Sequence, residues 1–332
     1  MVRVGVNGFG TIGKRVADAV SLQDDMQLAG VTMTKPSFKL DLARKLGYRV
    51  FSATADTKNF QSGDIAGTIE DLIRESDIII DCSPEMGEEN KKLYEKHAKK
   101  VIFEGGEEPQ IAQASFCAQA NYDEARGKQF VRVVSCSTTA LVRSLHAIDK
   151  AFGIENAYAV LVRRTTDPGD SKKGPVNAIV PETEMPSHQG PDVKTVLPHL
   201  PIFTAVVKTS TTLMHLHVIS VKLKQEASRE DVIKAFENTP RILLVDSKKG
   251  FSSTAEIMEY ARDLGRKRGD LYEIAIWKDS INVKHGILYF MQAVHQESDV
   301  VPENIDCIRA MLGLMGKEAS IEKTNRSLSI TK

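Results

Sequence analysis

The chain has 332 residues, and its 44 basic and 44 acidic side chains give a formal net charge of zero. This length accommodates two domains with proper cores, and the balanced charge argues against a generally basic surface for nucleic acid. The four cysteines lack the short paired spacing of a zinc site or a disulfide framework. No apolar run approaches the ~20 residues of a membrane span, and the opening residues predict a strand instead of a signal peptide. We therefore expect a cytoplasmic protein without metal, membrane or nucleic-acid partners.

A glycine pattern follows the first predicted strand. A β-branched run from Val2 leads into Gly8, Gly10 and Gly13, which have GxGxxG spacing, and residues 15–20 have helical character. A strand–turn–helix of this kind provides the tight turn and the close backbone approach that a dinucleotide pyrophosphate needs. We predict that these glycines bind NAD or NADP; the alternative is a glycine turn in an unrelated α/β protein.

The second predicted strand, residues 27–32, bears on the choice of cofactor. NAD-selective sites usually have Asp or Glu at the end of this strand, where the carboxylate binds the ribose 2′-hydroxyl. Here the strand is followed by Thr34, Lys35 and Pro36, with no carboxylate. Thr34 and Lys35 can hold a 2′-phosphate instead, although Lys35 can equally be a solvated loop residue. The sequence favours NADP or dual use.

Strands and helices continue to alternate up to about residue 150, which predicts a parallel sheet. Residues 76–82 and 100–104 read as strands, and residues 88–99 read as the helix between them. The second of these strands ends at a glycine pair that includes Gly106. A glycine there lets a nucleotide approach the backbone, or it serves as a plain turn.

Cys136 lies between a predicted strand at 130–134 and a predicted helix from residue 140. Its neighbours are Ser135, Ser137, Thr138 and Thr139, so the thiol is expected in the first turn of a helix. The positive end of a helix dipole favours a thiolate, and we expect the thiol pKa to be lowered. The hydroxyls there can bind a phosphate. The alternative is a buried cysteine beside ordinary helix caps.

The second half has longer alternating strands and Pro-rich loops, which predict a largely antiparallel sheet. We expect residues 1–136 to form a Rossmann-type dinucleotide-binding domain within an α/β chain, with a helical segment over 303–332 returning to it. Residues 137–302 are expected to form an α+β catalytic domain. Arg163 and Arg164, followed by the Lys172–Lys173 pair, have the donors to bind anions, or they belong to a solvated basic loop.

A predicted strand over residues 214–224 carries two histidines, His215 and His217, on its otherwise apolar face. They are either core residues whose hydrogen-bonding groups are paired, or one of them is the base that a catalytic cysteine needs. The pair can also bind a metal, but no third ligand is apparent.

With these motifs assembled, the chain resembles the archaeal-type phosphorylating glyceraldehyde-3-phosphate dehydrogenases nearly end to end. The segments that carry the resemblance are the glycine loop Gly5–Gly13, Thr34–Pro36, Ser135–Thr139, Lys172–Pro181, Met214–His217, Ala293–Glu297 and Val301–Asn304.

The resemblance implies that the enzyme oxidises glyceraldehyde 3-phosphate with inorganic phosphate to 1,3-bisphosphoglycerate, using NADP, NAD or both, as a homotetramer. It implies that Cys136 is the nucleophile and His215 its base, with His217 as the second choice. The cofactor contacts that it implies come from Thr11, Ile12, Gly106, Arg164 and Gln296. The substrate contacts come from Ser135, Ser137 and a loop that includes His188 and Gln189. The donors for two anion sites are Thr138, Thr139, Arg163, His188 and the lysine pair.

Three positions depart from the family pattern, which usually has Asn after the cysteine, Gly after the two threonines and paired histidines in the loop. This chain has Ser137, Ala140 and the pair His188–Gln189 there. Ser137 keeps a hydroxyl donor but loses the reach of an amide, and the neutral Gln189 weakens a phosphate contact. Neither change removes the nucleophile or the base, so we expect an active enzyme.

Three other interpretations stay open, of which a nucleic-acid role has only the local basic stretches behind it. A related dehydrogenase, such as an aspartate-semialdehyde or N-acetyl-glutamyl-phosphate reductase, also uses Cys, His and NADP but lacks the Lys172–Pro175 segment. A non-catalytic dinucleotide-binding protein is a different class, and the intact Cys136 and His215 argue against it.

Overall fold

The structure, a computed structural model, describes residues 1–84, 86–104, 106–165 and 177–330. The chain divides into two compact units: unit 1 contains the described residues of Met1–Val134 and Val301–Ser329, and unit 2 contains the described residues of Ser135–Val300 together with Ile330. The domain limits expected from the sequence, at residues 136 and 302, stay a prediction. No helix in this described part of the chain is long and apolar enough to cross a membrane.

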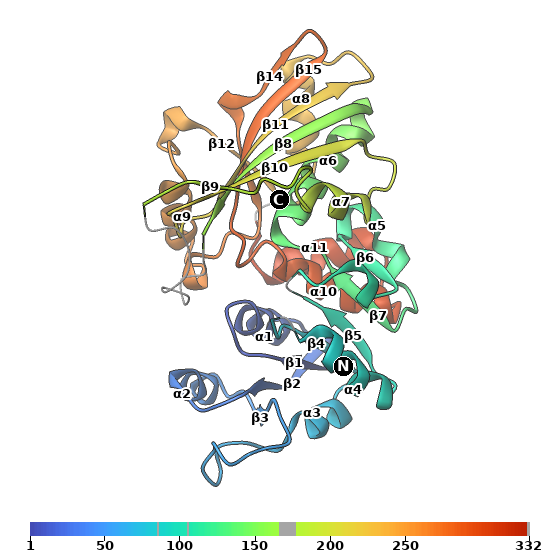
Figure 1. The fold of residues 1–332 in the computed structure, drawn as a ribbon, viewed down its shortest axis with the longest axis vertical. Coiled ribbons are helices and arrows are strands. Elements are labelled where there is room, and N and C mark those ends of the chain that lie inside the picture. The colour runs from blue at the N-terminus through green and yellow to red at the C-terminus, as the bar shows by residue number, and fades with distance from the viewer. Residues whose placement is uncertain (85, 105, 166–176, 331–332) are drawn as a thin grey trace. The chain divides into compact units, whose positions relative to one another are not determined.

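Unit 1 is an α/β unit (Figure 1). Its strands are β1 (Val2–Asn7), β2 (Met26–Met33), β3 (Val50–Ser52), β4 (Ile78–Asp81), β5 (Lys100–Phe103), β6 (Ala114–Phe116) and β7 (Phe130–Val133). Its helices are α1 (Gly13–Ser21), α2 (Phe38–Lys45), α3 (Ile69–Glu75), α4 (Gly87–Lys96), α5 (Ala118–Asn121), α10 (Val301–Leu312) and α11 (Lys317–Ser327), with short 3₁₀ turns η1 (Pro109–Ile111) and η2 (Tyr122–Ala125).

All strand pairs of unit 1 in the described residues are parallel, in the order β3-β2-β1-β4-β5-β7-β6. Strands such as β4 are apolar and buried, as expected for a parallel sheet that is covered on both faces. The strand order reverses between β1 and β4, and this switch point is where open α/β sheets bind ligands. The glycine pattern begins at the carboxyl end of β1.

Unit 2 contains strands β8 (Ile154–Arg164), β9 (Val180–Pro181), β10 (Ile202–Thr209), β11 (His215–Leu223), β12 (Ile242–Val245), β13 (Ile274–Trp277), β14 (Asn282–Lys284) and β15 (Ile287–Val294). Its helices are α6 (Cys136–Phe152), α7 (Gln189–Lys194), α8 (Arg229–Glu237) and α9 (Thr254–Asp263), with 3₁₀ turns η3 (Ser247–Lys249), η4 (Lys267–Gly269) and η5 (Lys278–Ser280).

Most strand pairs of the unit 2 sheet are antiparallel, while β8 pairs with β10 and β12 with β13 in parallel. The fold class predicted from the sequence is therefore confirmed for both units. Alternate residues of β11 are buried, and the long helix α6 contacts β8 and β15. His215 and His217 lie on the buried face of β11, and Val218 lies on the exposed face.

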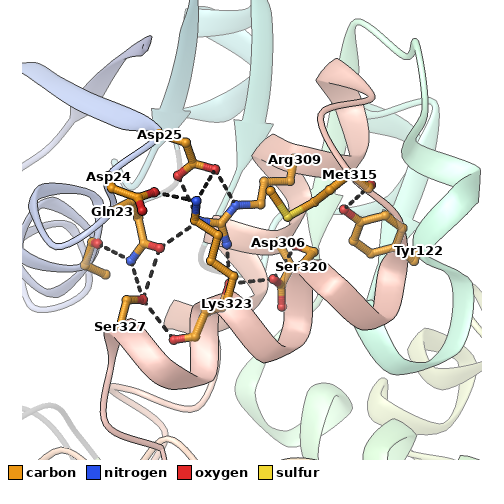
Figure 2. A network of polar contacts seen from close by, with 12 residues as sticks. Gln23, Asp24, Asp25, Tyr122, Asp306, Arg309, Met315, Ser320, Lys323 and Ser327 are labelled. Atoms are coloured by element: carbon orange, nitrogen blue, oxygen red, sulfur yellow. Dashed lines mark hydrogen bonds and ion pairs between the residues drawn. The ribbon is translucent and has the colours of Figure 1, made fainter.

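A buried polar cluster joins the last two helices to the rest of unit 1 (Figure 2). The Arg309 guanidinium, fully buried on α10, donates to both carboxylate oxygens of Asp25 at 2.9 Å and to Gln23 at 2.8 Å. It also donates to the Thr324 hydroxyl of α11 at 2.6 Å. Burial alone raises the pKa of Asp25, but the hydrogen bonds and charge of Arg309 lower it overall. Arg309 thus holds α10 and α11 to the segment that precedes β2.

We expect Arg309→Met to reduce the free energy of unfolding of the protein by about 3 kcal/mol, because the partly buried Asp25 carboxylate loses both hydrogen bonds from Arg309, while the Lys323 ammonium remains 3.7 Å away. Urea denaturation at neutral pH measures this loss. Arg326→Met is the matched control, since Arg326 of α11 forms an exposed pair with Glu322 and such pairs contribute about 0–1 kcal/mol. Equal effects of the two substitutions would contradict the importance of the buried pair.

Candidate active site

Cys136 is the first residue of α6, which confirms the prediction that its thiol lies in the first turn of a helix. Ser135 caps the helix: its hydroxyl accepts the backbone N–H of Thr138 at 3.5 Å and lies 3.0 Å from the Thr138 hydroxyl. The change from β-branched residues in β7 to hydroxyl residues at this junction explains why the strand ends and the helix begins here. Cys136 keeps partial exposure at this helix start.

The predicted pKa of the thiol is wrong in direction. Desolvation by the surrounding protein, with a further contribution from the negative charge of Asp299, raises the pKa of Cys136 to about 12. The positive charges of Arg163 and Arg164 and a backbone hydrogen bond at Ser137 act in the opposite direction but are weaker. The effect of the helix terminus on the thiol pKa is therefore smaller than the effect of burial. The free protein holds a neutral Cys136 thiol at neutral pH.

His215 is a neutral hydrogen-bond donor in this site. Its Nδ1 accepts the backbone N–H of Arg164 at 3.0 Å, so a neutral ring carries its proton at Nε2. Burial lowers the pKa of His215 well below the usual value, and the charge of Arg163 lowers it further. Cys136 and His215 both experience the charges of Arg163 and Arg164, which brings the two predicted catalytic residues into one electrostatic environment.

His217 has different surroundings. Its Nδ1 lies 3.2 Å from the side-chain amide nitrogen of Gln292, the residue opposite it on β15. Its Nε2 is buried and has no hydrogen-bond partner among the described residues. Burial and the charge of Arg163 lower the pKa of His217 to about 3. Of the two arginines, only Arg163 shifts the pKa of His217, whereas both shift the pKa of Cys136. His217 therefore shares less of its electrostatic environment with Cys136 than His215 does.

Arg164 and Gln296, two of the predicted cofactor contacts, lie against each other in unit 2. The buried Arg164 guanidinium donates to Glu297 at 2.8 Å. With the Gln296 amide in the orientation that satisfies its neighbours, the amide oxygen accepts from Arg164 Nη1 at 2.7 Å and Nη2 at 2.8 Å. The charge of Arg164 is therefore already matched by a carboxylate within the unit.

Several of the predicted substrate residues, those on α6 and Arg163 on β8, have side-chain polar atoms that are buried. The Thr138 hydroxyl donates to Asp192 of α7 at 2.6 Å, which fixes its orientation. The Ser137 hydroxyl and the Arg163 Nε are buried without a partner among the described residues. Thr139 is also buried. Unsatisfied buried polar atoms are uncommon in native proteins and often mark binding or catalytic sites.

The loop before α7 contains the other predicted substrate residues. His188 is exposed, and its Nε2 lies 2.9 Å from the side-chain nitrogen of Gln189. Gln189 itself is fully buried, and its side-chain carbonyl oxygen lacks a hydrogen-bond partner among the described residues. The Lys172–Lys173 pair, which was predicted to bind anions, lies outside the described residues.

The glycine loop of unit 1 fits a dinucleotide. Gly8 has a φ of +100°, which favours glycine, and a Cβ on Gly13 would lie 1.9 Å from the Gly8 carbonyl oxygen. A Cβ on Gly10 would meet no protein atom within 4 Å. Backbone conformation and packing therefore explain why positions 8 and 13 are glycine. The space at Gly10 is available for close approach of a pyrophosphate.

The other predicted cofactor residues of unit 1 lie at strand ends. Thr11 and Ile12 are partly exposed between Gly10 and α1. Thr34 and Lys35 are exposed and follow β2 directly. Gly106 is exposed after β5, with a φ of +88°. These positions agree with the edge at which open parallel sheets bind nucleotides.

Three acidic residues of the site were not predicted: Asp192, Glu297 and Asp299. Each contacts or electrostatically influences a predicted residue, namely Thr138, Arg164 and Cys136. Glu297 and Asp299 lie in the turn that follows β15 and are buried. Asp192 has no sequence signal that could have identified it.

Among the described residues no group of His, Cys, Asp and Glu side chains is arranged to hold a metal ion. The parallel sheet with its glycine loop and the separate mixed-sheet unit with the Cys136 site define an NAD(P)-dependent oxidoreductase. Residues 135–280 match the family described as glyceraldehyde 3-phosphate dehydrogenase, C-terminal domain.

The whole chain is similar to curated archaeal proteins. It is 55% identical over 335 residues to the glyceraldehyde-3-phosphate dehydrogenases of Pyrococcus furiosus and Thermococcus kodakarensis, covering 100% of this chain and 99% of each relative. It is 50% identical over 336 residues to that of Thermoplasma volcanium, with the same coverage. The chain belongs to the glyceraldehyde-3-phosphate dehydrogenase family, which confirms the resemblance found in the sequence.

We expect the rate of Cys136 alkylation by iodoacetamide to rise about tenfold per pH unit from pH 7 to beyond pH 10, because the reactive thiolate forms only as the pH approaches a pKa of about 12. Asp299→Asn removes a negative charge that opposes the thiolate, so it should increase the rate at each pH. Mass spectrometry of the labelled peptide measures both. Asp123→Asn, at an exposed site in unit 1, is the control. A wild-type midpoint below pH 8.5 would contradict the raised pKa.

Proposed function

We propose that this protein oxidises D-glyceraldehyde 3-phosphate with NAD(P)⁺ and inorganic phosphate to 1,3-bisphosphoglycerate, in glycolysis or gluconeogenesis. The observation that carries the proposal is the position of Cys136, a partly buried residue at the start of α6, in the same electrostatic environment as His215. The names of the full-length relatives support the substrate. Cys136 is the nucleophile and His215 the acid–base group in this proposal.

The first step is attack by Cys136. Its thiol releases a proton to solvent water, and the sulfur forms a bond to the aldehyde carbon as the carbonyl π bond breaks, which leaves a negative charge on the former carbonyl oxygen. Arg163 and Arg164 favour this step because their charges lower the pKa of the thiol against the effect of burial. Approach of the substrate excludes water further, which strengthens these charge interactions.

His215 acts on the oxygen that becomes negative. Because its Nδ1 accepts the Arg164 N–H, its Nε2–H is available to donate a hydrogen bond to this oxygen. When bound, the oxidised nicotinamide supplies the hydride acceptor. As the carbonyl forms again, Cys136 carries a thioester.

Phosphate completes the reaction. A phosphate oxygen attacks the thioester carbon, the Cys136 sulfur leaves and takes up the phosphate proton, and the acyl phosphate is released. We assign Ser135, Ser137, Thr138, Thr139, Arg163, His188 and Gln189 to the substrate and phosphate sites. The buried Ser137 hydroxyl and Arg163 Nε can donate to phosphate oxygens, and the side-chain carbonyl oxygen of Gln189 can accept from a substrate hydroxyl; all three lack partners among the described residues, which supports this assignment.

A steady-state assay tests the proposal. Purified protein is supplied with glyceraldehyde 3-phosphate, NAD or NADP, and phosphate or arsenate, and absorbance at the reduced nicotinamide band is followed. Turnover that depends on phosphate or arsenate and is abolished by Cys136→Ser supports the proposal. Turnover only with aspartate semialdehyde or an N-acetyl-glutamyl substrate would overturn it in favour of a related dehydrogenase.

We expect His215→Asn to slow the chemical step by ~10²- to 10⁴-fold, the usual contribution of a general acid–base group. His217→Asn should act mainly on stability. Its pKa of about 3 lies below the unfolded value of 6.5, so wild type loses stability as the pH falls below 6.5. The substitution should remove up to about 1.4 kcal/mol per pH unit from this slope. Single-turnover kinetics and denaturation from pH 7 to pH 5 separate the two roles. A reversed pattern would assign catalysis to His217.

We expect NADP to bind at least as well as NAD, because β2 is followed by Lys35 and by no carboxylate. Lys35→Ala should weaken NADP by up to roughly a hundredfold, since the 2′-phosphate loses a charge-assisted hydrogen bond, and should leave NAD nearly unchanged. The effect should shrink at high ionic strength because Lys35 is exposed. Titration of both cofactors measures it, with Lys96→Ala at an exposed site on α4 as the control. Equal losses for both cofactors would mean that Lys35 only shapes the loop.

The protein is further proposed to be a cytoplasmic homotetramer. Its four cysteines are free thiols, as is usual in a reducing compartment. The exposed sheet face of unit 2 carries Tyr158, Phe203, Val218, Tyr289 and Met291, of which Tyr158 and Phe203 stack on each other. Ile179, Val180 and Met185, in and near the edge strand β9, are further exposed apolar side chains. A tetramer with two-fold axes needs at least two such surfaces.

We expect sedimentation equilibrium to give the mass of four chains, and Val218→Lys to reduce it, because a lysine in the middle of the apolar sheet face cannot be buried without a partner. Lys222→Glu, on the same strand, changes charge without removing an apolar side chain and is the control. A wild-type monomer at micromolar concentration would contradict the proposal.

A further inference from the structure

A chain of hydrogen bonds runs beneath the glycine loop of unit 1. The Gly8 backbone N–H donates to the Thr32 hydroxyl at 2.8 Å, and this hydroxyl donates to the side-chain oxygen Oδ1 of Asn7 at 2.6 Å. The Asn7 amide donates to the Tyr94 hydroxyl at 2.9 Å, and that hydroxyl donates to the Asp81 carboxylate at 2.7 Å. Each group donates to the next, and the chain ends on a carboxylate.

The members of this chain come from four elements. Asn7 ends β1, Thr32 lies on β2, Asp81 ends β4 and Tyr94 lies on α4. All four side chains are buried, with exposures of 3% for Asn7 and 2% for Asp81 and none for Thr32 and Tyr94. A buried polar group that loses its partner is costly, so each bond in the chain strongly favours the position of the next group.

The Asp81 end of the chain is itself held in place. The Ser83 backbone N–H donates to one Asp81 oxygen at 2.9 Å, and the Asn90 side chain donates to the other at 2.9 Å. Asp81 therefore accepts hydrogen bonds from three further groups of the same region, including the Ser83 hydroxyl. Because Asp81 is fixed, the Tyr94 hydroxyl has one favoured position, and the Asn7 amide has a defined acceptor.

The Gly8 end of the chain is where the loop changes direction. Gly8 has a φ of +100°, and the Cβ that it lacks would lie 3.1 Å from the Cys82 carbonyl oxygen. Its own carbonyl oxygen is in close contact with Gly13, the first residue of α1. A shift of Gly8 would therefore move the start of α1 and the open space at Gly10 together.

We infer that Tyr94, acting through Asn7 and Thr32, is a positioning residue that holds the glycine loop in the conformation that binds the pyrophosphate of a dinucleotide. The inference rests on the proposed function, since it assumes that NAD(P) binds at this loop. Tyr94 itself is buried behind Asn7 and is not proposed to touch the cofactor. Its role is preorganisation: a loop that is already in its binding conformation loses less freedom when the ligand arrives.

The test compares cofactor affinity in variants that each remove one bond of the chain. Tyr94→Phe removes the hydroxyl that joins Asn7 to Asp81, and Thr32→Val removes the hydroxyl that joins Gly8 to Asn7. Each is expected to raise the Kd for NADP, measured by titration of intrinsic fluorescence, by about 5- to 50-fold. Thr32→Ser keeps the hydroxyl and should restore the affinity to within a few fold of wild type.

Tyr122→Phe is the matched control. Tyr122 is another buried tyrosine of unit 1, and its hydroxyl donates to the Met315 carbonyl oxygen at 3.1 Å, away from the glycine loop. It should lose stability without loss of cofactor affinity. In Tyr94→Phe, kcat at saturating NADP and the rate of Cys136 alkylation should stay near wild type, whereas a general loss of structure would change both.

Wild-type affinity in Tyr94→Phe, or equal weakening by Tyr94→Phe and Tyr122→Phe, would overturn the inference and leave the proposed function standing. Failure of Thr32→Ser to restore the affinity lost in Thr32→Val would also overturn it. If Tyr94→Phe does not fold, the Thr32→Val and Thr32→Ser pair decides the question alone. If the wild-type protein binds neither NAD nor NADP, the proposed function fails first, and the inference fails with it.

Discussion

Desolvation around the start of α6 is the constraint on which the candidate active site depends. Burial raises the pKa of Cys136 to about 12 and lowers that of His215 well below its usual value, so it holds both groups neutral. The two arginines at the end of β8 favour a thiolate and a neutral imidazole at the same time. A thiolate–imidazolium pair is disfavoured in this arrangement, because the Nδ1 of His215 already accepts a backbone N–H. The thiolate must therefore be stabilised by arginine charge and not by a protonated histidine.

The two arginines differ in whether a carboxylate already pairs with the guanidinium. Arg164 is buried and matched by Glu297, so its charge acts on the thiol through a fixed ion pair. Arg163 has a buried Nε without a partner among the described residues, and it affects Cys136, His215 and His217 alike. An anionic substrate that binds Arg163 would change all three groups at once. Substrate binding and thiol reactivity are thus electrostatically coupled through one residue.

Much of the fold could be predicted from the sequence because its signals are local. The glycine spacing after a β-branched run, the apolar run of β4 and the hydroxyl cluster at Cys136 each depend on neighbouring residues. The thiol pKa could not be predicted, because it depends on burial and on Asp299, which is distant in sequence. The same is true of the pairing of Arg164 with Glu297. The departures Ser137 and Gln189 were visible in the sequence, but only the structure shows that each has a buried polar atom without a partner among the described residues.

Buried polar groups are arranged differently beneath the glycine loop and among the candidate substrate residues, and the difference suits the two tasks. Beneath the glycine loop, Thr32, Asn7 and Tyr94 form a connected chain to a carboxylate, which suits a loop that must keep one conformation before a ligand arrives. Among the candidate substrate and base residues, by contrast, Ser137, Gln189 and His217 retain buried atoms without partners in the described chain. Such atoms cost free energy in the unliganded protein, and a polar substrate that pairs with them recovers that cost on binding. The hydrogen-bonded chain thus fixes the cofactor loop before binding, and the unpaired buried atoms gain hydrogen bonds when the substrate binds. Both arrangements direct binding energy to the reacting atoms.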